Sequence, residues 1–115
     1  MGSAAAPAAV TPSPAVEALV ARVDRARALT DLRRLAGDEP LCIAAGCVTL
    51  NNRQTRSDDL ERAMDYVVET TTALGYEVDD IPWRRGLYYG RNVIARKTGV
   101  LSPTEEVYFV AHVDG

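Results

Sequence analysis

Apolar residues recur at helical spacing in the first half of the chain. After Ser13-Pro14, a dipeptide that suits a helix start, an apolar stripe runs through Val16, Leu19, Val20, Val23 and Ala26. The stripe continues over residues 29–35, where we expect a second short helix that Thr30 caps and Gly37 ends. The pattern therefore predicts two consecutive helices before residue 38.

A third helix is predicted over residues 58–74. Ser57 is placed to cap it, and Asp58 and Asp59 lie at the positive end of the helix dipole. Gly75 follows where a helix commonly ends. Spacings of three and four put the following residues on one face: Leu60, Met64, Val67, Thr71 and Leu74.

Strands are predicted around and after this helix. Two short β-prone runs, residues 41–44 and 47–50, flank Gly46 and suggest a hairpin. Residues 76–81 alternate between apolar and polar, and residues 92–96 form a further β-prone run, with an aromatic and glycine-bearing loop expected between them.

The last predicted strand, residues 106–111, is apolar at consecutive positions. Such a strand is usually buried on both faces inside an α/β sheet. The chain offers few other strands and helices to cover it. The pattern therefore predicts an α/β fold whose sheet is unfinished.

Composition narrows the class of protein. The chain has 115 residues with 47% hydrophobic and 25% charged residues, enough for one small globular domain over residues 16–115. Its net charge of -3 argues against a nucleic-acid binder. No apolar run is long enough to span a bilayer. Residues 1–15 are rich in Ala, Pro and Ser and predict a disordered tail rather than a signal peptide.

The cysteines, Cys42 and Cys47, have two interpretations. Two cysteines alone cannot complete a structural zinc site. They form either a local disulfide across the hairpin, as an oxidising compartment would allow, or a pair of small buried hydrophobic residues.

His112, the only histidine, follows the predicted buried strand directly. The carboxyl ends of strands in open α/β sheets line the usual ligand crevice. Asp114 lies two residues on, and a metal-bound imidazole normally donates its second N–H to such a carboxylate. Gly115 allows the backbone to turn away. Taken alone, this spacing is also typical of a structural histidine.

The surrounding pattern resembles the di-zinc aminopeptidases of clan MH, such as the bacterial leucyl aminopeptidases. Residues 91–99 are similar to their "N-V-I-A…G" strand, and residues 103–114 resemble the acidic turn and apolar strand that end in "G/A-H-x-D". Residues 63–78 resemble the preceding "A-x-x-Y-I…L-x-x-L-G-Y-x-V" helix and strand, and residues 32–37 resemble an early helix end. The resemblance covers roughly residues 25–114.

This resemblance implies a fold, a cofactor and a substrate. The fold would be the N-terminal portion of a three-layer α/β/α sandwich with a mixed sheet, the phosphorylase/hydrolase-like fold, cut after its first metal motif. His112 would bind one zinc of a pair, Asp114 would orient it, and the substrate would be a peptide. The family's bridging aspartate, Glu-Glu pair, further aspartate and distal histidine match no residue here, so we expect no peptidase activity from the 115 residues alone.

Other interpretations compete with this one. The alternatives are a non-catalytic α/β interaction module that pairs through its sheet edge, and a carboxypeptidase-like enzyme of the same clan. The resemblance suggests secretion or a periplasmic location, whereas the N-terminus shows no clear signal peptide. Paired acids fit structural roles: Asp58 and Asp59 at a helix start, Asp79 and Asp80 on opposite sides of a strand.

Three aromatic residues and two arginines lie in the loop expected over residues 82–90. Trp83, Tyr88 and Tyr89 are expected to cover the core rather than to line a substrate cleft. Arg84 and Arg85 are expected to be solvated.

Overall fold

The structure is a computed structural model that describes residue 2 and residues 4–115. Its helices are α1 (Pro14–Ala21), α2 (Arg25–Ala36) and α3 (Asp58–Ala73), and its strands are β1 (Leu41–Ile43), β2 (Gly46–Val48), β3 (Glu77–Arg85) and β4 (Tyr88–Arg96). Within this part of the chain, β1 pairs with β2 and β3 pairs with β4, both antiparallel. The chain therefore mixes helices with small sheets, which confirms the α/β class at that coarse level.

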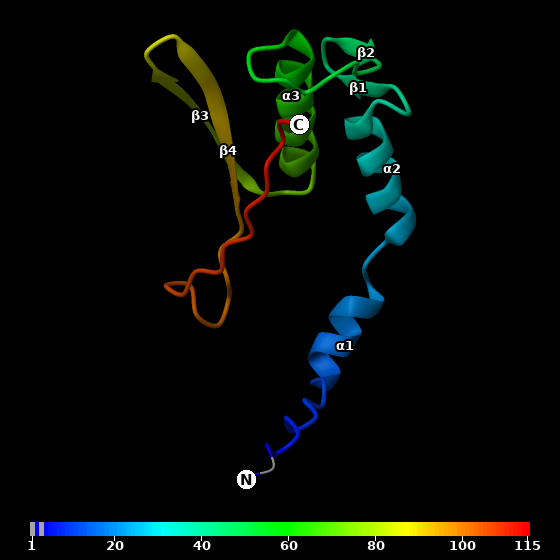
Figure 1. The fold of residues 1–115 in the computed structure, drawn as a ribbon, viewed down its shortest axis with the longest axis vertical. Helices are drawn as coiled ribbons and strands as arrows, with labels where there is room; N and C mark the ends of the chain where they lie inside the picture. Colours follow the sequence, from blue (N-terminus) through cyan, green and yellow to red (C-terminus); the bar gives the residue numbers. More distant parts are fainter. Residues whose placement is uncertain (1, 3) are drawn as a thin grey trace.

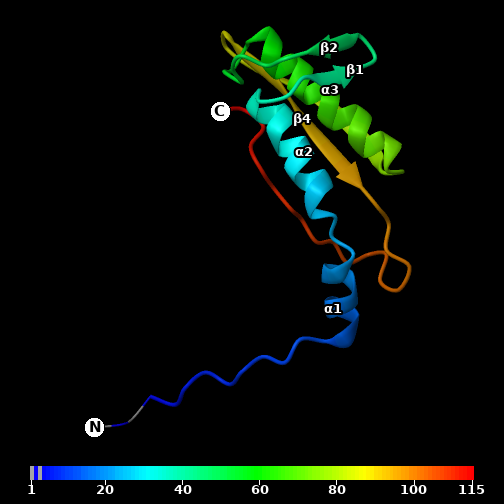
Figure 2. The ribbon, with the colours of Figure 1, turned by 90° about the vertical axis from the view of Figure 1, so that its right-hand side faces the viewer.

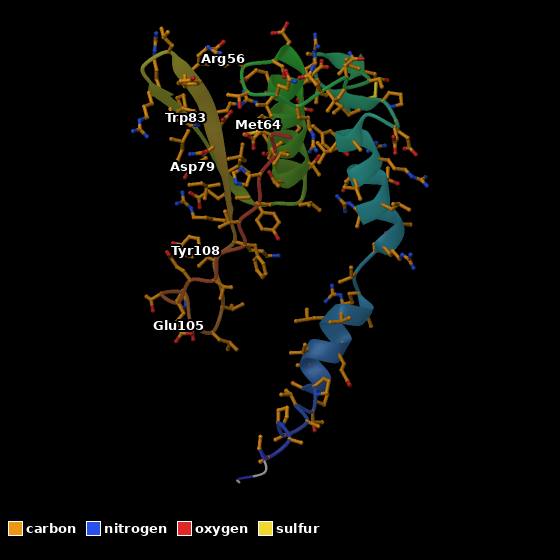
Figure 3. All side chains as sticks on the ribbon, in the orientation of Figure 1. Arg56, Met64, Asp79, Trp83, Glu105 and Tyr108 are labelled. Carbon is orange, nitrogen blue, oxygen red and sulfur yellow. A yellow bond between two sulfur atoms is a disulfide. The ribbon has the colours of Figure 1, made fainter. Side chains whose placement is uncertain are left out.

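Helix α3 lies between the two hairpins (Figure 1), and it contacts β1 as well as β3 and β4. The core cluster joins β1, the segment after β2, and α3 through Leu41, Leu50, Ala63 and Tyr66. Met64 is buried outside this cluster, on the side of α3 toward the β3–β4 hairpin (Figure 3). The sequence predicted one apolar face for α3, but the helix buries a second side through Ala63 and Tyr66.

The ends of α3 form where the sequence predicts them. The Ser57 hydroxyl accepts a hydrogen bond from the Leu60 N–H at 3.0 Å, and Gly75 has a φ of 83° just after the helix. Gly37 likewise ends α2 with a φ of 81°. A Cβ at Gly37 would lie 2.2 Å from the Leu50 carbonyl oxygen, so this close approach also requires glycine.

The start of α2 differs from the prediction. Asp24, not Thr30, caps it: the Asp24 carboxylate accepts from the Arg27 N–H at 3.0 Å. The Thr30 hydroxyl instead donates to the Ala26 carbonyl inside the helix. Because the Asp24 cap competes with a continuous helix, the first apolar stripe divides between α1 and α2.

The prediction of a loop over residues 82–90 is also wrong, because β3 and β4 continue through these residues as a long hairpin. Its turn lies at Gly86 and Leu87, and Gly86 has a φ of 62°. Pro82 is tolerated because a two-stranded sheet has only edge strands, where a missing N–H need not break a ladder. Trp83 therefore does not cover the core; it lies over Gly90, its cross-strand partner.

The predicted strand over residues 106–111 is not formed. Figure 2 shows this segment as an extended trace outside the two hairpins. Its side chains are exposed, Phe109 by 96% and Val110 by 91%. A strand forms only when a neighbour supplies hydrogen-bond partners for its backbone, and no strand in the described part of the chain does so here.

The N-terminal end projects from the rest of the molecule. Residues 4–13 form no helix or strand and are exposed, and α1 begins at Pro14, inside the predicted tail. The radius of gyration is 19.0 Å, compared with about 13 Å for a compact domain of this length. The prediction of disorder over residues 1–15 stays a prediction, and Met1 and Ser3 lie outside the described residues.

Asp59 is a buried carboxylate, only 8% exposed. It accepts hydrogen bonds from the Asn51 N–H at 2.8 Å and from Arg62 at 2.9 Å, and so ties the segment after β2 to α3. The Asn51 N–H lowers the pKa of the Asp59 carboxyl below its ordinary value of 3.8, against the opposing effect of burial.

We predict that the Asp59 carboxylate makes the stability of the fold depend on pH in the acidic range. Because the pKa of Asp59 is lowered by folding, its contribution is complete above the ordinary carboxyl pKa and is lost as the pH falls through the lower folded value. Between about pH 7 and about pH 3, the free energy of unfolding should therefore decrease less in the Asp59→Asn variant than in the unsubstituted chain. Urea unfolding at both pH values measures this difference. Asp38→Asn, an exposed control, should behave like the unsubstituted chain; equal pH dependence in all three would contradict the assignment.

Candidate functional site

His112 and Asp114 lie in contact near the end of the chain. The His112 Nδ1 and an Asp114 carboxylate oxygen are 3.1 Å apart. The His112 side chain is 94% exposed, which leaves its Nε2 open to solvent. A carboxylate at Nδ1 is the partner that fixes the orientation of a metal-binding imidazole. The two side chains are therefore in contact, whereas their role at a metal stays a prediction.

The residue between them anchors this segment. The Val113 side chain packs against the core cluster, and the Gly115 N–H donates to the Arg53 carbonyl at 3.0 Å. Alternate side chains of an extended segment point to opposite sides. Because Val113 faces the core, His112 and Asp114 share the solvent side.

A zinc site would need more ligands than His112 and Asp114. A catalytic zinc usually takes three protein ligands and a water. In the part of the chain that the structure describes, no three His, Cys, Asp or Glu side chains gather closely enough to hold a metal ion. A role for His112 and Asp114 in binding a metal therefore stays a prediction.

The paired acids have structural roles, as expected. Asp79 pairs with Arg96, whereas Asp80 lies 3.6 Å from Arg91, so the two carboxylates engage different partners. Asp58 and Asp59 lie in the first turn of α3. Among the described residues, neither pair contacts His112, so neither forms part of the candidate site.

Cys42 and Cys47 form a disulfide between cross-strand partners of the β1–β2 hairpin. Both residues are exposed. Of the two interpretations left open by the sequence, the structure therefore contains the disulfide and not a buried apolar pair.

A polar cluster at the α2–α3 contact was missed by the sequence reasoning. The Tyr66 hydroxyl donates to Asp31 at 2.6 Å and accepts from Arg34 at 2.9 Å, beside a cavity of about 460 Å³. The hydrogen bond to Tyr66 raises the pKa of Arg34. The spacing of Arg27, Asp31 and Arg34, which puts them on one side of a helix, is the sequence signal that could have indicated this cluster.

No protein-family model, curated protein or solved structure matches the chain. Across the described residues, none of the helices has the length and apolar character needed to cross a membrane.

The His112–Asp114 contact predicts a specific tautomer. At a pH where the ring is neutral, Asp114 should favour the proton on Nδ1 and leave Nε2 unprotonated. Long-range ¹⁵N–¹H NMR of the imidazole should report this form, and Asp114→Ala should shift the population toward protonated Nε2. The sole histidine makes the signal unambiguous. An identical spectrum in the Asp114→Ala variant would show that the contact does not form in solution.

Proposed function

We propose that the chain is the N-terminal part of a zinc-dependent exopeptidase of the aminopeptidase type. In this proposal His112 is a ligand of one zinc of a pair, Asp114 orients it, and the substrate is a peptide. The observation that carries the proposal is the 3.1 Å contact between His112 Nδ1 and Asp114 with the opposite ring nitrogen exposed. The resemblance of residues 25–114 to the di-zinc aminopeptidases supports it.

The exposed apolar segment supports the fold part of the proposal. Residues 107–110 are Val, Tyr, Phe and Val, and each is more than 70% exposed. Four consecutive apolar side chains in solvent are unfavourable, and burying them between a completed sheet and its helices would remove that cost. We therefore infer that these residues form an inner strand of a three-layer α/β/α sandwich, whose remaining strands come from outside the described residues.

The roles of the residues follow from this arrangement. When bound, zinc lowers the pKa of a coordinated water toward about 7 and polarises the scissile carbonyl. Asp114 would accept a hydrogen bond from the Nδ1–H group, which keeps the proton on Nδ1 and leaves Nε2 free to bind. Val113, anchored in the core, and Gly115, bonded to Arg53, would hold His112 at the end of the strand.

Zinc titration of the 115-residue chain tests the proposal. With one histidine ligand, we expect weak binding that His112→Ala removes and that Asp114→Ala weakens by about 10-fold or more, because the orienting carboxylate typically contributes that much. Isothermal titration measures the affinity, with Asp38→Asn as an exposed carboxylate control that should bind like the unsubstituted chain. Hydrolysis of leucine p-nitroanilide by this chain alone should be absent.

Two results would contradict the proposal. One is zinc binding that is unaffected by His112→Ala. The other is peptidase turnover by the 115-residue chain that is lost with His112→Ala, because that would require a complete active site within these residues.

A non-catalytic interaction module is the second candidate function. The observation that favours it is that the β3–β4 sheet has only two strands in the described part of the chain, so both of its edges can accept another strand. Zinc binding that is insensitive to His112→Ala would favour this second function over the first.

A further inference from the structure

The long β3–β4 hairpin has two faces, and α3 packs against one of them. Side chains alternate between the faces along each strand, and cross-strand partners share a face. Arg91 is on the face toward α3, where it pairs with Glu61 and Asp65. The alternate residues form the opposite face, which we call the outer face: Glu77, Asp79, Ile81, Trp83 and Arg85 of β3, and Tyr88, Gly90, Asn92, Ile94 and Arg96 of β4.

The middle of the outer face is apolar and open to solvent. Ile81 is 43% exposed, Trp83 40% and Ile94 39%. The register makes Ile81 and Ile94 diagonal neighbours, and Trp83 is two residues along the same strand from Ile81, so these side chains are within reach of one another. The Trp83 ring lies over its cross-strand partner Gly90, where a Cβ would come within 2.9 Å of the ring. The glycine therefore lets the indole lie flat on the hairpin.

The two ends of the outer face carry charges of opposite sign. Arg85 lies beside the turn and Glu77 begins β3, and among the described residues neither takes part in an ion pair. Asp79 and Arg96 pair with each other, so their charges cancel. The outer face is thus positive near the turn, apolar in its middle and negative at its other end.

This order of charges fits a second copy of the same face. Two sheets pack face to face about 10 Å apart, with their strands aligned to within about 30°. A twofold axis that runs across the strands, between two such faces, reverses the direction of one hairpin relative to the other. The axis places Glu77 of each copy opposite Arg85 of the other, and Ile81 opposite its own counterpart.

We propose that the outer face of the hairpin binds the outer face of a second copy of the chain in a twofold symmetric dimer. Ile94 of each copy packs on the Trp83 ring of the other, because that ring covers Gly90, the residue opposite Ile94 in this arrangement. Two ion pairs between Glu77 and Arg85 fix the antiparallel arrangement, since a parallel one would place like charges together. A self-complementary face is what such an isologous interface requires.

The size of the outer face sets the expected affinity. Each strand has 9 residues, which at about 3.3 Å per residue gives a length of about 30 Å, and a two-stranded sheet is about 10 Å wide. Such a face is at the lower end of the range for specific interfaces, so we expect a dissociation constant of about 10 to 100 µM. The proposal does not rest on the peptidase function, because none of its residues belongs to the candidate metal site.

Sedimentation velocity of the 115-residue chain, from about 5 to about 500 µM, tests the proposal. Trp83→Ser should raise the dissociation constant of the dimer by at least about tenfold, because the indole forms the apolar centre of the interface. Arg85→Glu should raise it by about tenfold, because both ion pairs become repulsive. Combining Arg85→Glu with Glu77→Lys should return it to within about threefold of the unsubstituted value, because the pair is restored with its signs exchanged.

Arg84→Glu is the matched control. Arg84 is exposed and adjacent to Arg85, but the register places it on the opposite face of the hairpin. The same change of charge should therefore alter the dissociation constant by less than about twofold. Circular dichroism checks that each variant is folded, and Arg85→Glu at the exposed end of β3 suffices if Trp83→Ser does not fold.

Four outcomes would overturn the proposal. The chain stays monomeric over the whole concentration range, or Arg84→Glu weakens the dimer as much as Arg85→Glu, which indicates an effect of net charge. Glu77→Lys fails to restore the dimer in the Arg85→Glu background, which contradicts the twofold arrangement. The dimer persists with Trp83→Ser and is abolished by Phe109→Asp, which assigns the contact to the exposed segment over residues 106–111.

Discussion

The guanidinium of Arg91 connects the long hairpin to the rest of the molecule. It lies on β4, is only 20% exposed, and reaches Asp65 and Glu61 on α3 and Asp80 on β3. Burial lowers the pKa of Arg91, but the pairs with Asp65 and the other carboxylates outweigh that effect and raise it. Partly exposed ion pairs contribute at most about 1 kcal/mol each to folding stability. The main effect of these pairs is therefore to fix the position of the hairpin.

Helix α3 connects the two halves of the molecule. One side packs on β1 through Ala63 and Tyr66, and another faces β3 and β4. This leaves the segment over residues 106–111 without a strand to pair with in the described residues, although Val113 reaches the core beyond it. The exposed apolar segment and the anchored His112–Asp114 pair thus follow from the same arrangement: Val113 fixes the end of the segment, whereas residues 106–111 form no strand.

Local features were predictable from the sequence, whereas the pairing of strands was not. The Ser57 cap, the glycine at 75 and the contact between His112 and Asp114 depend on residues no more than three positions apart. Gly37 also ends a helix as predicted, whereas its close approach to Leu50 is not local. The strand over residues 106–111 was predicted wrongly because its formation depends on partners distant in sequence. The loop over residues 82–90 was wrong because Pro82 and Gly86 were interpreted as breakers, although they are compatible with a two-stranded hairpin and its turn.

The central claim is that His112 binds a catalytic zinc with Asp114 behind it. The most direct measurement is hydrolysis of leucine p-nitroanilide by the protein translated from the whole reading frame that contains these residues, after saturation with zinc. We predict activity that falls by at least about 100-fold with His112→Ala and by about 10- to 100-fold with Asp114→Ala. Absence of hydrolysis, or hydrolysis that His112→Ala leaves unchanged, would contradict the account.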